Sequence, residues 1–185
     1  PMGMGKTSAS LAIIDVLKNI FEEGPALVIA PLAVARNSWP SEVRKWEDFC
    51  HLKVSPILGT TKERIKALHT KADIYVINYD NLMWLDNFLT SKNYTWPFPV
   101  VIADESTRLK SFRTRQGSKR AKALAKFSNF FKRFIALTGT PSPNGLNDLW
   151  GQLWFIDHGE RLGKSFTAFH NRWFRPLQVG ANAAA

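Results

Sequence analysis

Five short apolar segments recur along this chain, and they constrain its fold more than any other feature. They cover residues 26–30, 53–58, 74–78, 100–103 and 134–137. None of them alternates between apolar and polar residues, as a strand with one face in water would. Uninterrupted apolar runs are typical of strands that are covered on both faces, and they therefore predict a parallel sheet.

Segments with helical spacing of apolar residues lie between these runs. They cover residues 7–21, 40–49, 61–69, 81–91, 116–131 and 145–156, with a further one at 164–174. Alternating strands and helices with right-handed crossovers predict a three-layer α/β/α domain with a mainly parallel sheet. We expect one lobe over residues 1–160, and a helical extension with a frayed tail over residues 161–185.

A glycine-rich loop that ends in Lys6 and Thr7 stands at the start of the chain. Its glycines allow backbone N–H groups to surround phosphates, Lys6 places a charge on the β- and γ-phosphates, and the Thr7 hydroxyl can ligate Mg²⁺. The helix that follows adds N–H groups and a favourable dipole. The residues expected to bind the nucleotide are Gly3, Met4, Gly5, Lys6, Thr7 and Ser8. The first glycine of the full motif would precede Pro1, so a chance match in a basic loop is the alternative.

Two adjacent carboxylates, Asp104 and Glu105, end the fourth apolar run. A carboxylate at the end of a buried strand can hold Mg²⁺, and its neighbour can orient and deprotonate water. We assign the metal to Asp104 and Thr7 and the water to Glu105; a solvated acidic turn is the alternative. Ligands of parallel sheets bind at the carboxyl ends of strands. Lys6, the acidic pair and Thr138 are therefore expected to converge on one nucleotide.

Four segments in order resemble motifs of superfamily 2 helicases in their Snf2-like form. They are residues 27–34 with Trp39 (motif Ia), 73–80 (motif Ib), 104–110 (the second motif) and 137–144 with 148–150 (the third motif). The resemblance implies a RecA-like P-loop domain, the ATP-binding lobe of a DNA-dependent ATPase that uses ATP and Mg²⁺ to move along duplex DNA. It implies Lys6, Asp104 and Glu105 as catalytic residues.

The resemblance also implies which residues connect nucleotide and nucleic acid. Coupling between them would fall to Thr138, Gly139 and Thr140. Contacts with nucleic acid would fall to Pro31, Arg36, Arg108, Lys110 and Arg113.

The chain departs from the family at two points. Ser106 and Thr107 stand where the family usually has Ala and His, a variant that resembles phage and prophage members. The second RecA-like lobe, which supplies arginine fingers, is absent from these residues, so we expect weak or no ATP hydrolysis by this chain alone.

Composition adds limits on partners. A formal net charge of +10 and a pI near 10.0 suit a polyanion, although a solvated basic face is the alternative. No apolar stretch reaches the roughly 20 residues of a membrane span, so a soluble, cytoplasmic protein is expected.

One cysteine gives no disulfide framework, and the histidines lack the spacing of a zinc site. Trp39 and Trp46 are expected in the core.

Two other functions stay open on the sequence alone. One is a non-catalytic module that binds DNA or a partner. The other is a different P-loop enzyme, such as a phage DNA-packaging ATPase. The segment from Thr138 to Pro141, followed by Asp148, Leu149 and Trp150, favours the Snf2-like interpretation over the packaging enzyme.

Overall fold

One parallel sheet forms the centre of the protein in this computed structural model, which describes residues 5–112 and 119–175. Its strand order is β2-β3-β1-β4-β5, and every neighbouring pair is parallel. The strands are β1 (Ala26–Ala30), β2 (Val54–Ile57), β3 (Ile74–Asn78), β4 (Val100–Asp104) and β5 (Arg133–Leu137). The predicted α/β class with a parallel sheet is confirmed.

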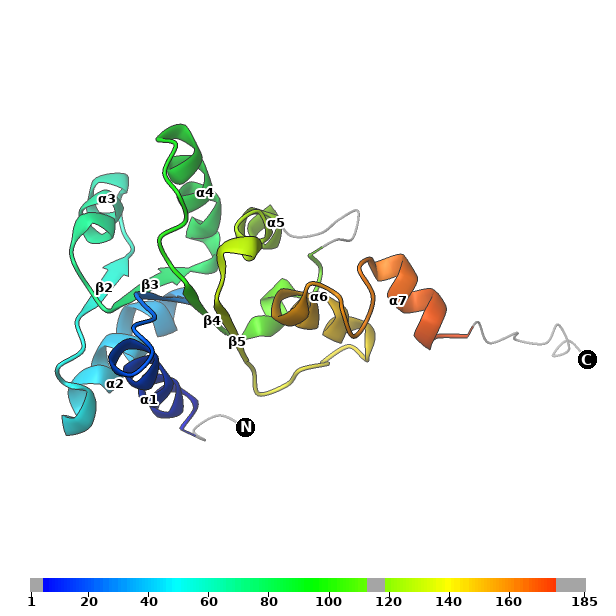
Figure 1. Cartoon of the computed structure of the whole chain (residues 1–185), viewed down its shortest axis with the longest axis horizontal. Helices are drawn as coiled ribbons and strands as arrows, with labels where there is room; N and C mark the ends of the chain where they lie inside the picture. Colours follow the sequence, from blue (N-terminus) through cyan, green and yellow to red (C-terminus); the bar gives the residue numbers. More distant parts are fainter. Residues whose placement is uncertain (1–4, 113–118, 176–185) are drawn as a thin grey trace, which may run out of the picture.

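Helices cover both faces of the sheet (Figure 1). They are α1 (Lys6–Asn19), α2 (Trp39–Lys45), α3 (Thr61–His69), α4 (Leu82–Ser91), α5 (Lys119–Ala125), α6 (Asn147–Asp157) and α7 (Phe166–Trp173). Helices α1 and α2 pack on one face, and α4, α5 and α6 pack on the other. Two layers of helices around a sheet give the three-layer architecture expected from the sequence.

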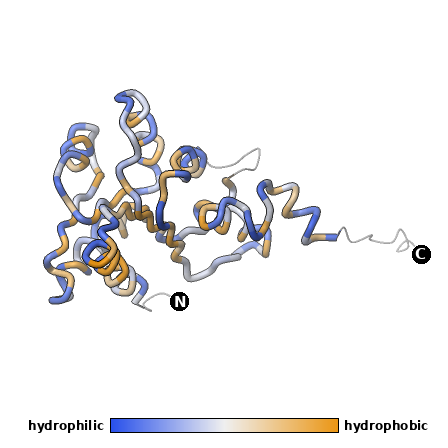
Figure 2. Tube along the Cα trace, in the orientation of Figure 1, coloured by the Kyte–Doolittle hydropathy of each residue, from blue (hydrophilic) through white to orange (hydrophobic). Residues whose placement is uncertain are grey.

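The strands send successive side chains into two separate cores. Leu27 and Ile29 of β1 join the core beneath α4 to α6, while Val28 and Ala30 join the core beneath α1 and α2. This alternation follows from the period of two residues in a strand. Figure 2 shows the central strands as the most continuous hydrophobic part of the trace.

Local structure departs from the prediction in three places. Residues Val34–Ser38 form a π-helix that no sequence signal indicated. The helix predicted over residues 40–49 ends at Lys45, because Trp46 has extended backbone, and a short 3-10 turn follows at Glu47–Phe49. In the helix predicted over 116–131, α5 ends at Ala125, and residues 116–118 lie outside the described part.

Strand β5 is less covered than the sequence predicted. Arg133 is exposed and the four residues after it are only partly buried. The expectation that all five strands are covered on both faces is wrong for β5, and also for β2, whose Pro56 is exposed, because these two strands lie at the edges of the sheet. An apolar run alone does not distinguish a central strand from an edge strand.

Helix α7 packs against α6 through aromatic side chains. Phe169 is buried, and the rings of Phe166 and Trp150 lie 5.8 Å apart. The Trp150 indole N–H donates to the Gly163 carbonyl at 2.9 Å, which fixes the turn before α7. The boundary near residue 160 stays a prediction. Among residues 5–112 and 119–175, no helix combines the length and the apolar character that a bilayer crossing requires.

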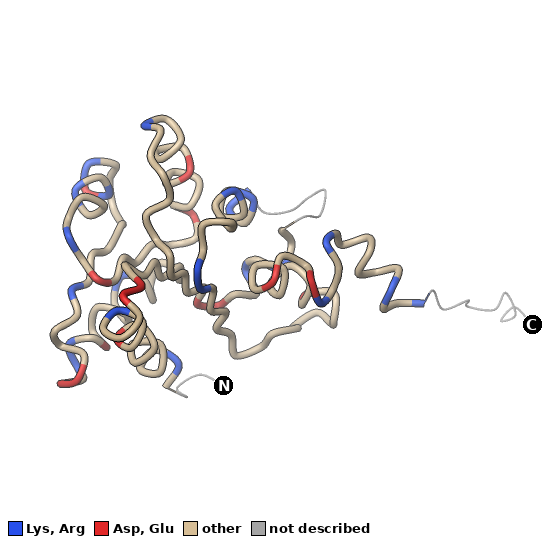
Figure 3. Tube along the Cα trace, in the orientation of Figure 1, with Lys and Arg blue, Asp and Glu red and all other residues tan. Residues whose placement is uncertain are grey.

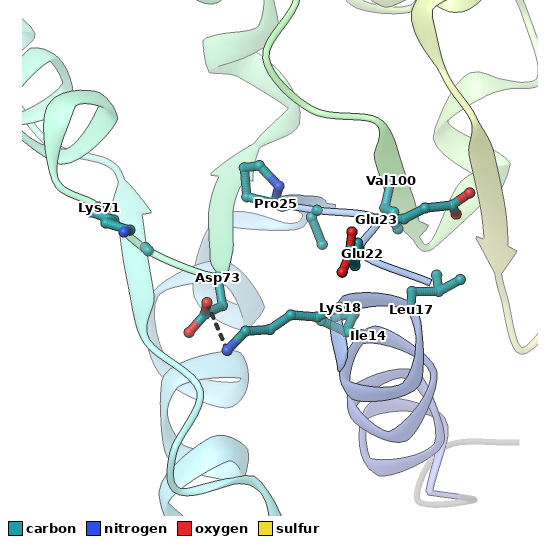
Figure 4. Close-up of a pocket in the computed structure, with 12 residues that line it drawn as sticks. Ile14, Leu17, Lys18, Glu22, Glu23, Pro25, Lys71, Asp73 and Val100 are labelled. Atoms are coloured by element: carbon teal, nitrogen blue, oxygen red, sulfur yellow. Dashed lines mark ion pairs between the residues drawn. The ribbon is translucent and has the colours of Figure 1, made fainter. Parts of the chain in front are cut away.

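Asp73 ties α1 to the amino-terminal edge of the sheet. The Lys18 ammonium lies 3.0 Å from its carboxylate, and the backbone N–H of Lys53 donates to it at 2.8 Å. Figure 4 shows Lys18 reaching from α1 across a cavity of about 250 Å³ to Asp73. Burial raises the pKa of Asp73, but the Lys53 hydrogen bond and the Lys18 charge outweigh it, so the pKa lies below its ordinary value.

This lowered pKa predicts a dependence of stability on acid. The contribution of Asp73 should be complete above about pH 4, the ordinary pKa of an aspartate, and should disappear as the pH falls through the lower folded pKa. Asp73→Asn should therefore lower the free energy of unfolding by up to about 1 kcal/mol near pH 7, since a partly exposed ion pair is screened. The difference from the unchanged protein should shrink towards pH 3.

Urea unfolding between pH 7 and pH 3 measures this difference. Asp48→Asn, which changes an exposed carboxylate, is the matched control. A loss for Asp73→Asn that is the same at pH 7 and pH 3 would contradict the prediction.

Candidate functional site

A cavity of about 500 Å³ lies at the carboxyl end of β4. Its lining comes from the start of α1, the end of α2 and the end of β4: Gly5, Lys6, Thr7, Ser8, Glu42, Lys45, Trp46 and Asp104. Lys6 and Asp104, far apart in the sequence, thus lie on one cavity. Of the four residues expected to converge there, Lys6 and Asp104 line this cavity, and Glu105 and Thr138 do not.

Gly5 and the first turn of α1 form one wall of this cavity. Gly5 has a φ of +69°, a left-handed conformation that glycine adopts without steric cost. Helix α1 begins directly after it with no side chain capping its first N–H groups. Uncapped N–H groups and the positive end of the helix dipole favour an anion there. Gly3 and Met4 lie outside the described residues.

Asp104 is a buried carboxylate with both oxygens engaged. Only 8% of the surface of Asp104 is exposed to solvent. The Trp39 indole N–H donates to one oxygen at 3.2 Å, and the Glu105 backbone N–H donates to the other at 3.1 Å. Because a buried charge is costly without such partners, these bonds hold the carboxylate in place at the cavity wall.

Glu105 turns the chain sharply after β4. Its backbone is left-handed, with φ 55° and ψ 55°, and this directs its half-exposed side chain towards Arg108, whose Nε lies 3.8 Å from the carboxylate. Of the described residues, Asp104 lines the cavity and Glu105 does not. The structure therefore brings the metal candidate to the phosphate loop and leaves the water candidate beside it.

The buried Tyr79 side chain supports this turn from below. Its hydroxyl donates to the carbonyl oxygens of Asp104 at 2.8 Å and Glu105 at 3.3 Å. Burial, and then the negative charge of Asp104, raise the pKa of Tyr79 far above its ordinary value. The hydroxyl therefore stays a neutral donor to the two carbonyls.

The third motif begins at the end of β5, next to the end of β4 that carries the acidic pair. Asp104 is the register partner of Leu137, so Thr138 follows at the same edge of the sheet. The Thr138 hydroxyl accepts a hydrogen bond from the Thr140 backbone N–H at 3.1 Å, which shapes the loop around the exposed Gly139. The coupling role of these three residues stays a prediction.

The described residues that were expected to contact nucleic acid lie in two segments, one after β1 and one after β4. Pro31 is partly buried and Arg36 is exposed, both in the segment that follows β1. Arg108 pairs with Glu105, and Lys110 pairs with Asp148 at 3.0 Å. Arg113 lies outside the described residues. Their contact with nucleic acid stays a prediction, and Lys110 also has a structural role in holding α6.

Ion pairs partly neutralise the basic residues in and around α5. Arg120 pairs with Asp80, and Lys126 pairs with Asp86, whose side chain is buried. Figure 3 shows basic residues along α5, and acidic residues close to it. The net charge of the chain therefore does not by itself show which basic residues are available to bind a polyanion.

Sequence reasoning missed part of the cavity wall. Trp39 is fully buried as expected, but Trp46 is 40% exposed and lines the cavity, so its assignment to the core is wrong. The Trp46 indole N–H donates to Glu42 at 2.9 Å, and the Lys45 ammonium lies 5.1 Å from the ring centre. Seven-residue spacing indicated one face of a helix, but α2 ends before Trp46.

The oxygen donors of the cavity suit magnesium that arrives with a nucleotide. Within the described residues, no three His, Cys, Asp or Glu side chains gather as a metal site. Mg²⁺ typically needs only one or two protein oxygens, because phosphates and water complete its shell. The Thr7 hydroxyl and the Asp104 carboxylate are such donors on one cavity.

Comparisons with known proteins agree with this geometry. The family model described as SNF2-related domain matches residues 1–184. A protein named p41 from Acyrthosiphon pisum secondary endosymbiont phage 1 is 53% identical over 96% of this chain and 39% of its own length. The ATP-dependent helicase FUN30 of Saccharomyces cerevisiae is 32% identical over 84% of this chain and 13% of its own length.

Solved structures show the same fold. The Sulfolobus solfataricus SWI2/SNF2 ATPase core domain has a TM-score of 0.61 and 28% identity, covering 92% of this chain and 32% of that one. The Pyrococcus furiosus Hef helicase domain has a TM-score of 0.62 at 20% identity, covering 85% of this chain and 32% of that one. The chain thus spans well under half the length of each of these proteins.

The support that Tyr79 gives to the acidic turn predicts the effect of Tyr79→Phe. The ring is retained, but two carbonyl oxygens lose their donor, so the free energy of unfolding should fall by roughly 1–2 kcal/mol. Because the folded pKa is raised, the contribution of Tyr79 is complete below about pH 10 and is lost as the pH rises further. The variant should therefore lose less stability than the unchanged protein above pH 10.

Urea unfolding at pH 7 and pH 11 tests both statements. Tyr94→Phe, which removes the hydroxyl of an exposed tyrosine, is the control. Equal stability of the two variants at pH 7 would show that the Tyr79 hydroxyl does not support the turn.

Proposed function

The chain belongs to the SNF2-related domain family, and we propose that it binds ATP with Mg²⁺ as the ATP-binding lobe of a DNA-dependent, Snf2-like translocase. One observation carries the proposal: Lys6 and Thr7 share a cavity with the buried Asp104 carboxylate. A cationic side chain, uncapped helix N–H groups and a carboxylate for a metal are the groups that a magnesium triphosphate requires.

Each residue has a distinct role in this proposal. The N–H groups after Gly5 and the Lys6 ammonium hold the β- and γ-phosphates, and Thr7 with Asp104 holds the metal. Bound Mg²⁺ would neutralise charge that develops on the phosphates. Glu105 orients the attacking water and takes its proton. Its exposed position beside the cavity supports this role, because the water must reach the γ-phosphate from outside the phosphate loop.

Hydrolysis by the chain alone is expected to be slow. Phosphoryl transfer depends on positioning and on neutralising charge around the γ-phosphate. The resemblance assigns part of that charge to arginines of a second lobe. Nucleotide binding is therefore a more direct measure of this chain than turnover.

The rival functions fit less well. A phage packaging ATPase is disfavoured by membership of the SNF2-related domain family. A non-catalytic module is disfavoured because the chain keeps Lys6, Asp104 and Glu105 together, and Lys6 and Asp104 line one cavity.

Removing the Lys6 charge should weaken nucleotide binding. Hydrogen bonds to charged groups contribute roughly 1.5–3 kcal/mol, so Lys6→Ala should raise the Kd of a fluorescent ATP analogue with Mg²⁺ about 10- to 100-fold. Fluorescence titration of the 185-residue chain measures this change. Lys92→Ala, which removes an exposed charge at the end of α4, is the control. An unchanged Kd for Lys6→Ala would refute the site.

Duplex DNA is proposed as the partner, and its phosphates would be met at the carboxyl edge of the sheet. Arg36 supports this, because it is exposed just after β1, at the edge that also holds the cavity. A lysine or arginine that neutralises a phosphate releases counterions, and this makes affinity fall as salt rises.

Arg36→Ala should therefore change the salt dependence of DNA binding. The slope of log affinity against log salt should become less steep by about 1, with similar weakening on unrelated duplex sequences. Fluorescence anisotropy with labelled duplexes at several salt concentrations measures this slope. Lys71→Ala is the control, because Lys71 lies at the amino-terminal edge (Figure 4). Equal slopes for the two variants would count against a DNA contact at Arg36.

A further inference from the structure

A buried polar bridge joins the acidic turn to helix α6. Ser106 is completely buried and Gln152 is 4% exposed. The Ser106 hydroxyl donates to the Gln152 side-chain carbonyl at 2.8 Å. A hydrogen bond that is shielded from water is strong, and either side chain would be destabilising if it lost its partner.

Gln152 extends the bridge to the third motif. Its amide nitrogen donates to the Pro141 carbonyl at 2.6 Å and to the Asp148 carbonyl at 2.8 Å. Both amide hydrogens and the amide oxygen are therefore engaged. Pro141 directly follows the segment Thr138 to Thr140, so one side chain contacts both the turn after Asp104 and the loop after β5.

Helix α6 also contacts the end of the segment that follows the acidic turn. A Cβ at Gly151 would overlap the carbonyl oxygens of Leu109 and Lys110, so only glycine fits there. The Lys110 ammonium also pairs with Asp148 on α6 at 3.0 Å. These contacts lie at the far end of the segment Ser106–Leu109, whereas Ser106 directly follows Glu105, so the Ser106–Gln152 bond joins α6 to the part of the segment next to the two acids.

The bridge also gives a reason for one departure from the family pattern. Ser106 stands where the family usually has Ala, and an alanine could not make this bond. Its hydroxyl is placed immediately after the two acids that would hold the metal and the water.

We propose that the Ser106–Gln152 bridge is a positioning device that transmits the nucleotide state of the Asp104–Glu105 turn to the loop from Thr138 to Pro141. This inference rests on the proposed function, since it needs a nucleotide at the Lys6 cavity. A shift of the turn would move Ser106, and Gln152 would pass the shift to Pro141 because both of its amide hydrogens are already donated to backbone carbonyls. Neither Ser106 nor Gln152 lines the Lys6 cavity, so both act as positioning residues.

Hydrogen exchange with mass spectrometry tests the transmission directly. The 185-residue chain is compared without nucleotide and with a saturating, slowly hydrolysed ATP analogue plus Mg²⁺. In the unchanged chain, the nucleotide should slow exchange both in the phosphate loop and in residues 138–146. In Ser106→Ala, and in the double variant Ser106→Ala with Gln152→Leu, protection of the phosphate loop should persist and the change over 138–146 should disappear.

Ser128→Ala is the matched control. Ser128 is also buried, but its hydroxyl donates only locally, to Ala125 at 2.9 Å. It should keep the response over 138–146, which separates transmission from general destabilisation. The double variant leaves no unpaired polar side chain at either bridge position, although it also removes the Gln152 donor of the Pro141 and Asp148 carbonyls, so exchange over 138–146 without nucleotide is compared among all variants.

The outcomes separate the two hypotheses. No protection of the phosphate loop in the unchanged chain would mean that the proposed function is wrong. Protection of that loop without any change over 138–146 would overturn the bridge as a transmitter. A response over 138–146 that survives in Ser106→Ala and in the double variant would overturn it equally.

Discussion

The burial of the Asp104 carboxylate is the constraint on which the site depends. It sits at the end of a central strand, 8% exposed, where an ion without partners would be unstable. Its two hydrogen bonds come from Trp39 at the start of α2 and from the backbone of Glu105. Satisfying one charge therefore fixes where α2 packs and how the chain turns after β4, and both of these elements border the cavity.

The turn after β4 places the Glu105 side chain at a cost in local backbone stability. A left-handed backbone at a glutamate costs roughly 1–2 kcal/mol, which the surrounding structure must offset. Tyr79 offsets part of it by donating to both carbonyl oxygens of the turn. In return, the Glu105 side chain leaves the strand direction and lies half-exposed near Arg108.

Sequence reasoning predicted the parts that depend on local pattern. Strands β1 and β3 and helix α3 match the predicted ranges, because uninterrupted apolar runs and helical spacing are properties of neighbouring residues. The common position of Lys6 and Asp104 was also predictable, since parallel strands end at one edge. The Trp39–Asp104 and Ser106–Gln152 bonds were not, because they join residues far apart and depend on exact packing. The exposure of Trp46 was missed because a single extended residue ended α2 early.

The separation of the two cores explains why the carboxyl edge matters for communication. The core beneath α1 and α2 and the core beneath α4 to α6 lie on opposite faces of the sheet. A change at the phosphate loop belongs to the first layer, whereas α6 and Pro141 belong to the second. Closely packed strands between them leave little room for a shift through the sheet. The end of β4 meets both layers, with Asp104 bonded to Trp39 on one side and Ser106 bonded to Gln152 on the other, so it joins them through two hydrogen bonds.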